Sequence, residues 1–166
     1  MDAAYDPERW TDFAIAVAGA AAALAGLLVV AVSINLREII AGPRLPGRAA
    51  SALIALTAPL VTALFLLIPD QSDDALALEL VMLGLVLGLL LGLFNWPVNL
   101  PPQRTYGQWL YGSAIPVILV VAPTILAGAG MLVDSLGGLY WLPVAVLAAI
   151  LGGLGQAWVL LIEILR

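Results

Sequence analysis

Few side chains in this sequence have the chemistry of a catalytic residue. The chain has no cysteine and no histidine, and its six basic residues are all arginine. Without these two residue types it lacks the usual general base near neutral pH, the commonest metal ligand and any thiol nucleophile. The remaining residues form no nucleophile–base pair, phosphate-binding loop or metal-ligand spacing. We therefore expect a protein that is not an enzyme and that binds no cofactor and no metal.

Three carboxylates lie inside the apolar segments of the chain: Asp12, Glu79 and Glu163. A carboxylate in the middle of a membrane span would indicate transport or a proton relay, whereas one near a helix end is usually interfacial or complements the helix dipole. Each of these three lies close to the end of its segment, so the interfacial interpretation is favoured. Towards mid-membrane the polar residues are uncharged, chiefly Thr57, Thr62, Ser113, Thr124 and Gln156.

The composition places these residues in a membrane protein. The chain of 166 residues is 63% hydrophobic and 10% charged, with a mean hydropathy of +1.10. Soluble domains are roughly 45–50% apolar and about 25% charged. We predict an all-α, polytopic integral membrane helix bundle that forms a single membrane domain over 1–166. Its five transmembrane helices are expected at about 10–36, 49–68, 75–94, 109–133 and 139–165, long enough to cross a ~30 Å hydrocarbon core.

The first span, WTDFAIAVAGAAAALAGLLVVAVSINLR, is the most patterned segment. Gly19, Gly26 and Ser33 recur every seven residues along one side of the expected helix. A row of small residues lets another helix backbone come close in lipid, and a seven-residue period favours a left-handed crossing. Acidic residues precede the span where a signal peptide would be positively charged, so we expect an uncleaved transmembrane helix.

The third span contains a glycine zipper, with Gly84, Gly88 and Gly92 at strict four-residue spacing. Two interpretations are open, namely close packing inside the same bundle or a face for self-association or for a partner's helix. Internal packing is slightly favoured. In the fifth span, Gln156 lies beside three glycines and is the strongest candidate for an interhelical hydrogen bond.

The arginines predict the orientation of the bundle. With five spans, five of the six arginines fall on one side of the membrane: Arg37, Arg44, Arg48, Arg104 and Arg166. The positive-inside rule places this side in the cytoplasm and the N-terminus outside. Four of these arginines also form a candidate basic group for lipid headgroups, although a role in topology alone is favoured: Arg37, Arg44, Arg48 and Arg104.

The run AGAAAALAGLLVVAVSINL, with the following turn PRLPGRA, resembles the N-terminal half of a family of small bacterial membrane proteins. Members of that family are often labelled modulators of the FtsH protease. The resemblance covers about residues 1–50. It implies an inner-membrane protein that touches a membrane protease, and it implies no catalytic residue.

Together these features predict a bacterial inner-membrane protein that acts through helix–helix interaction, as a scaffold or a regulator. Its expected partners are the lipid bilayer, other copies of itself in a homo-oligomer and another membrane protein, but no nucleic acid. The alternative is a small oligomeric channel in which polar groups of spans one, two or five line a pathway. A wettable centre would favour the channel, and a dry centre the interaction protein. An enzyme that acts on lipid ranks third.

Overall fold

The computed structural model describes residues 3–42, 45–95 and 114–164. Arg44, Arg104, Ser113 and Arg166 lie outside the described residues, as does the side chain of Glu163. The described chain is helical and contains no β-strand, which confirms the all-α class. Its elements are η1 (Ala3–Tyr5), η2 (Pro7–Trp10), α1 (Thr11–Ile34), α2 (Leu36–Ala41), α3 (Leu45–Leu66), α4 (Asp73–Asn95), α6 (Ile115–Leu132), η4 (Gly138–Trp141) and α7 (Leu142–Ile164).

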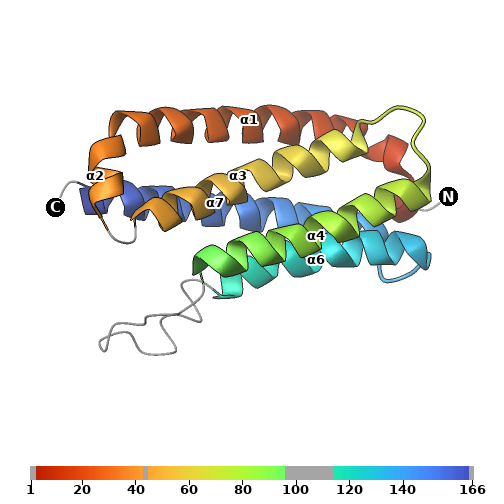
Figure 1. The fold of residues 1–166 in the computed structure, drawn as a ribbon. Coiled ribbons are helices and arrows are strands. Elements are labelled where there is room, and N and C mark those ends of the chain that lie inside the picture. Colours follow the sequence, from red (N-terminus) through yellow and green to blue (C-terminus); the bar gives the residue numbers. More distant parts are fainter. Residues whose placement is uncertain (1–2, 43–44, 96–113, 165–166) are drawn as a thin grey trace.

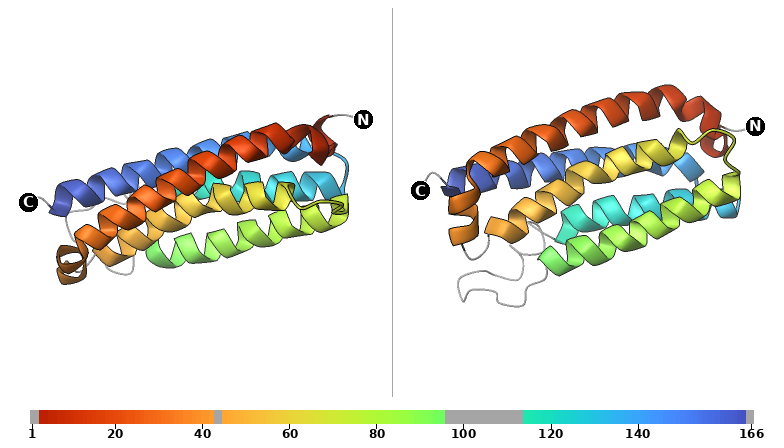
Figure 2. Two further views of the ribbon diagram at one scale, coloured as in Figure 1. Left: turned by 90° about the horizontal axis from the view of Figure 1, so that it is seen from above. Right: turned by 45° about the horizontal axis from the view of Figure 1, so that its top comes forward.

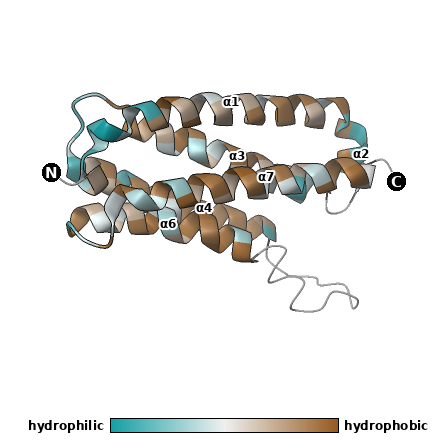
Figure 3. Cartoon of the chain, turned by 180° about the vertical axis from the view of Figure 1, so that it is seen from behind, coloured by the Kyte–Doolittle hydropathy of each residue, from teal (hydrophilic) through white to brown (hydrophobic). Residues whose placement is uncertain are grey.

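Five of these helical segments are long and apolar enough to cross a membrane, as the hydropathy of the sequence predicts. They run side by side, so that the two termini lie at opposite ends of the bundle (Figure 1). Hydrophilic residues gather towards the two ends, whereas the helix walls between them are mostly hydrophobic (Figure 3). This distribution is that of a multi-pass membrane protein.

Helix α3 lies in the middle of the bundle. It packs against α1, α4 and α7, while α6 packs between α4 and α7 (Figure 2). In the most apolar stretch of the span Leu45–Leu66, 56% of the residues are buried inside the bundle. The corresponding share for the span Pro7–Ile34 is only 22%. Helix α1 is therefore peripheral and is held mainly through one face on α3.

The structure shifts the predicted start of the second span, and it leaves the predicted start of the fourth span untested. Helix α3 begins at Leu45, not at residue 49, because Pro46 lies in its first turn and does not end the preceding turn. A proline is tolerated there since the first amides of a helix have no intrahelical acceptor. Helix α6 is described only from Ile115, and the earlier part of its predicted span lies outside the described residues.

The start of α4 follows the capping rules. The Ser72 Oγ accepts a hydrogen bond from the Ala75 amide at 3.3 Å. Asp73 and Asp74 occupy the first turn, where the helix dipole favours acidic side chains. The loop before α4 contains Asp70 with φ 54°, a left-handed conformation that aspartate and asparagine adopt more readily than most residues.

The N-terminal segment is tied to the turn between α6 and α7. The Tyr5 hydroxyl accepts a hydrogen bond from the Gly137 amide at 3.3 Å. The Trp10 Nε1 donates to the Ala3 carbonyl at 2.7 Å, and its ring makes an edge contact with Tyr140 at 5.5 Å between centroids. These contacts hold η1 and η2 over one end of the bundle, which we call the N-terminal end.

Candidate functional site

Two glycines of the zipper lie against α6 of the same chain. A Cβ built on Gly84 would meet the side chain of Ile125, and one built on Gly88 would lie 3.3 Å from the Val121 Cγ1. A Cβ on Gly92 would have nothing within 4 Å. The first two glycines therefore serve packing inside the bundle, whereas the third is not part of that contact.

Gly128 of α6, which was not among the predicted site residues, lies against the backbone of α4 in the same interface. A Cβ at Gly128 would meet the Ala77 carbonyl oxygen and would lie 2.9 Å from the Val81 amide nitrogen, both on α4. Backbone atoms cannot turn aside as a side chain can. The available signal was the small-residue run Ala127–Gly130 in the fourth span.

The small-residue row of α1 faces away from the bundle. Gly19, Gly26 and Ser33 are all exposed, and a Cβ on either glycine would have nothing within 4 Å. The Ser33 hydroxyl donates to the Val29 carbonyl of its own helix at 2.7 Å. At ~100° of rotation per residue, the buried face of α1 lies roughly half a turn away from this row. That buried face consists of Ala14, Val17, Ala21, Ala25 and Leu28.

The interhelical hydrogen bond predicted for Gln156 is not found among the described residues. The Gln156 Oε1 is buried and has no partner in that part of the chain. It borders a space of about 10 Å³ together with Ala55, Pro116 and Gly152. These neighbours present methyl, methylene and Cα groups to the space, so no side-chain donor is available there.

Three threonine hydroxyls in the bundle bond to carbonyls of their own helices, whereas the buried Ser51 hydroxyl accepts a hydrogen bond from the Asn95 Nδ2 of α4 at 2.8 Å. Thr57 donates to the Leu53 carbonyl at 2.9 Å, and Thr62 donates to the Ala58 carbonyl at 3.0 Å. Thr124 donates to the carbonyl one turn before it at 2.7 Å. Thr62 and Thr124 border a space of only about 10 Å³, room for about one water molecule. The described part of a single chain therefore shows no continuous wet pathway along these residues.

Two of the four candidate headgroup arginines can be placed. Arg37 is exposed on α2, and Arg48 is partly buried in the first turns of α3. Helix α2 and the start of α3, which carry these residues, lie at the end of the bundle opposite to the N-terminal end (Figure 1). The other two arginines of this group, Arg44 and Arg104, lie outside the described residues.

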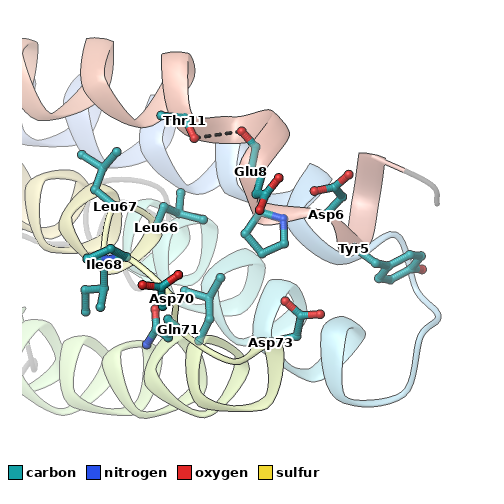
Figure 4. A pocket seen from close by; sticks show the side chains of 13 residues that line it. Tyr5, Asp6, Glu8, Thr11, Leu66, Leu67, Ile68, Asp70, Gln71 and Asp73 are labelled. Carbon is teal, nitrogen blue, oxygen red and sulfur yellow. Dashed lines mark hydrogen bonds between the residues drawn. The ribbon is translucent and has the colours of Figure 1, made fainter.

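A cleft opens at the N-terminal end, between the N-terminal segment, the α3–α4 loop and the start of α4 (Figure 4). Its volume is about 510 Å³, within the roughly 300–1,000 Å³ of small-molecule sites. We call it the acidic cleft because four carboxylate residues line it: Asp6, Glu8, Asp70 and Asp73. In the sequence, Asp6 and Glu8 precede the first span and Asp70 and Asp73 precede the third, and only the fold brings the two pairs to one space.

Apolar and backbone groups complete the acidic cleft. Its lining includes the buried Leu66 and Leu76 and the half-buried Leu67. On the N-terminal side, the Thr11 hydroxyl donates to the Glu8 carbonyl at 2.8 Å and fixes the turn that carries this carboxylate. The lining of the cleft therefore includes both carboxylates and apolar side chains.

Comparisons of the chain with protein-family models, with curated proteins and with solved structures found no match. Membership of the FtsH-modulator family, which the resemblance of about residues 1–50 implies, therefore stays a prediction. Hydropathy, helix length and packing establish a multi-pass membrane protein with an all-α fold.

Proposed function

We propose that this chain is a non-enzymatic bacterial inner-membrane protein that acts through helix–helix interaction, as a scaffold or regulator, and that forms a homo-oligomer through α1. The exposed row of Gly19, Gly26 and Ser33 carries the proposal. In lipid, such a row lets a second helix approach closely enough for extensive van der Waals and Cα–H···O contacts. Each glycine costs about 0.8–1 kcal/mol of helix propensity relative to alanine in a soluble host. A helix that served only as an anchor would gain nothing in return for that cost.

The proposal includes an orientation, with the N-terminus outside and the C-terminus in the cytoplasm. Arg37 and Arg48 support it, because α2 and the start of α3, which carry them, lie at the end of the bundle opposite to the acidic α3–α4 loop (Figure 1). Positive residues are enriched in cytoplasmic loops. A second membrane protein, such as the protease that the resemblance implies, would be a further partner for the exposed row of α1.

The channel alternative has weaker support. Thr57, Thr62 and Thr124 already donate to carbonyls of their own helices, and the spaces beside Thr62 and Gln156 are about 10 Å³ each. A conducting pathway would therefore have to form between copies of the chain. No specific contact favours such a pathway, so we retain helix–helix interaction as the proposed function.

The substitution Gly26→Leu tests the proposal. Gly26 and Gly155 are both exposed helical glycines with nothing within 4 Å of a built Cβ. Neither Gly26→Leu nor Gly155→Leu should therefore strain the protomer. Gly155→Leu is thus a matched control on α7. We expect Gly26→Leu to shift the protein towards monomer, while Gly155→Leu keeps the wild-type oligomer. Subunit counting by single-molecule photobleaching in lipid nanodiscs measures both.

Circular dichroism and thermal unfolding of the two variants check that each protomer stays folded. A wild-type protein that is monomeric at all protein-to-lipid ratios would disprove the homo-oligomer. The same subunit number in wild type and Gly26→Leu would show that α1 is not the interface. If both Gly26→Leu and Gly155→Leu dissociated the oligomer, the cause would be any added bulk on the lipid-facing surface and not a specific α1 interface.

A further inference from the structure

The small interior space beside Gln156 lies where four helices meet. Besides Gln156, its lining includes Ala55 of α3, Leu91 of α4, Pro116 of α6 and Gly152 of α7. Its volume of about 10 Å³ is close to the smallest that holds one water molecule. Gln156 has the only polar side chain among the described residues that line it. The space is therefore too small for an organic ligand, and one side chain gives it a polar wall.

Gln156 brings a hydrogen-bond acceptor without a donor to this space. Its Oε1 is buried and has no hydrogen-bond partner among the described residues. Long side chains on a helix point back towards the helix N-terminus. Gly152 and Ala148, about one and two turns before Gln156, line the same space, so the amide extends along α7 into it. A buried amide oxygen without a donor is destabilising, and in folded proteins such an atom almost always has a protein or water partner.

A second acceptor lies on α3. Residue 59 is a proline inside this helix and has no N–H, so the Ala55 carbonyl lacks its usual donor four residues later. The carbonyl of a helical residue points towards the residue four positions on. The Ala55 carbonyl therefore lies on the face of α3 that carries Ala55 and Pro59, and Ala55 borders the space beside Gln156. In membrane helices, ordered water is one of the groups that satisfy a carbonyl freed by proline.

We infer that one water molecule is bound between α3 and α7, where it donates one hydrogen bond to the Gln156 Oε1 and the other to the Ala55 carbonyl. Water fits both the volume and the chemistry, because the two protein groups are acceptors and water supplies two donors. The bound water satisfies both acceptors and connects α7 to α3 one turn before the proline. This inference is independent of the proposed homo-oligomer, since neither residue belongs to the exposed α1 row.

The neighbouring space supplies a control. Thr62 and Thr124 border it, and their hydroxyls already donate to carbonyls of their own helices at 3.0 and 2.7 Å. Unlike the Gln156 Oε1, both hydroxyls therefore have a hydrogen-bond partner. Thr124→Val replaces one hydroxyl with a methyl group of similar size. The Val120 carbonyl, which accepts from Thr124, keeps its helical amide donor in this variant.

A crystal structure grown from a lipidic mesophase, at a resolution that shows ordered water, tests the inference directly. We expect an electron-density peak at hydrogen-bonding distance, about 2.5–3.0 Å, from both the Gln156 Oε1 and the Ala55 carbonyl oxygen. Gln156→Leu should lack this peak, because leucine has no acceptor and the Ala55 carbonyl alone would give the water a single partner. Thr124→Val should keep it.

Unfolding by SDS titration gives a second measurement on the same variants. We expect Gln156→Leu to lower the equilibrium constant for folding several-fold, because the Ala55 carbonyl loses the water that satisfied it. Thr124→Val should change this constant less than about twofold. An amide oxygen that had no bound water would give the opposite result for Gln156→Leu, since the leucine would then remove an unpaired acceptor and raise the constant.

Four results would overturn the inference. Absence of the density peak in the wild type would show that no water is bound there. A direct hydrogen bond from the Gln156 amide nitrogen to the Ala55 carbonyl would leave the water without a role. A peak that persisted in Gln156→Leu would show that Gln156 does not bind the water. A rise in the equilibrium constant for folding in Gln156→Leu would show that the amide oxygen is unpaired in the wild type.

Discussion

Helices α1 and α4 both carry a row of small residues, yet the two rows have opposite surroundings. On α4, a Cβ on Gly84 would meet Ile125 of the neighbouring helix. On α1, neither Gly19 nor Gly26 has an atom within 4 Å of a built Cβ. The spacing of small residues shows that a helix can be approached closely. Only the arrangement of the whole bundle shows which helix makes the approach.

The difference follows from the position of each helix. Helix α4 lies between α3 and α6, and α6 brings Gly128 against its backbone near Ala77. Helix α1 lies at the edge of the bundle and uses its opposite face, which includes Ala21, to pack on the other helices. The α4 row is thus satisfied within one chain. The α1 row is the one that remains available to another chain.

The largest expected effect is that of Gly128→Leu, in the α4–α6 interface. The added side chain would need the space of the Ala77 carbonyl and the Val81 amide, so α4 and α6 must separate. We expect a loss of roughly 3 kcal/mol in the free energy of unfolding, at the upper end of overpacking effects. Unfolding by SDS titration, followed by circular dichroism, measures this. Gly155→Leu, with open space around it, is the control. Equal unfolding curves for the two variants would contradict a tight α4–α6 contact.

A smaller effect separates two glycines of the same zipper. Gly84→Ala should lower the free energy of unfolding by about 1–2 kcal/mol, because the methyl group displaces Ile125 and presses on its backbone nitrogen at 3.3 Å. Gly92→Ala should leave stability unchanged or raise it by up to about 1 kcal/mol, since the methyl group meets nothing and alanine favours the helix. The same SDS titration compares the two. If both substitutions changed the free energy of unfolding by the same amount and in the same direction, Gly84 and Gly92 would have similar surroundings, and the α4–α6 contact would include both.

The sequence was sufficient for the fold class and the spans, because hydrophobic runs of this length have few alternatives in lipid. The sequence did not predict where α3 begins, because a proline such as Pro46 is common both in a turn and in the first turn of a helix. Nor could it separate Gly84 from Gly26, since the distinction depends on where α6 lies. For Gln156 the polar side chain predicted a partner, whereas the described residues around it present no other polar side chain.

The acidic cleft was also beyond the reach of sequence reasoning. Its carboxylates come from the segment around Asp6 and Glu8 and from the loop around Asp70 and Asp73. They come together only because α1, α3 and α4 end at the same level of the bundle (Figure 2). The runs of acidic residues were visible in the sequence, but the apolar side chains that line the cleft with them are brought there by tertiary packing. The sequence therefore predicts the charge at the membrane edge, whereas the grouping of these carboxylates depends on the fold.

The smallest expected loss of protomer stability is that of Gly19→Ala combined with Gly26→Ala, in the α1 row. Both methyl groups would point into open space in a single chain, so the protomer should keep its stability or gain up to about 1 kcal/mol per site from helix propensity. Self-association should weaken several-fold, because two methyl groups would hold the partner backbone slightly away. Thermal unfolding of dilute protein reports the first quantity, and subunit counting over a range of protein-to-lipid ratios reports the second. If the double variant instead destabilised the dilute protomer, the row would already be covered within one chain. The contrast between α1 and α4 would then disappear, because both rows would serve internal packing.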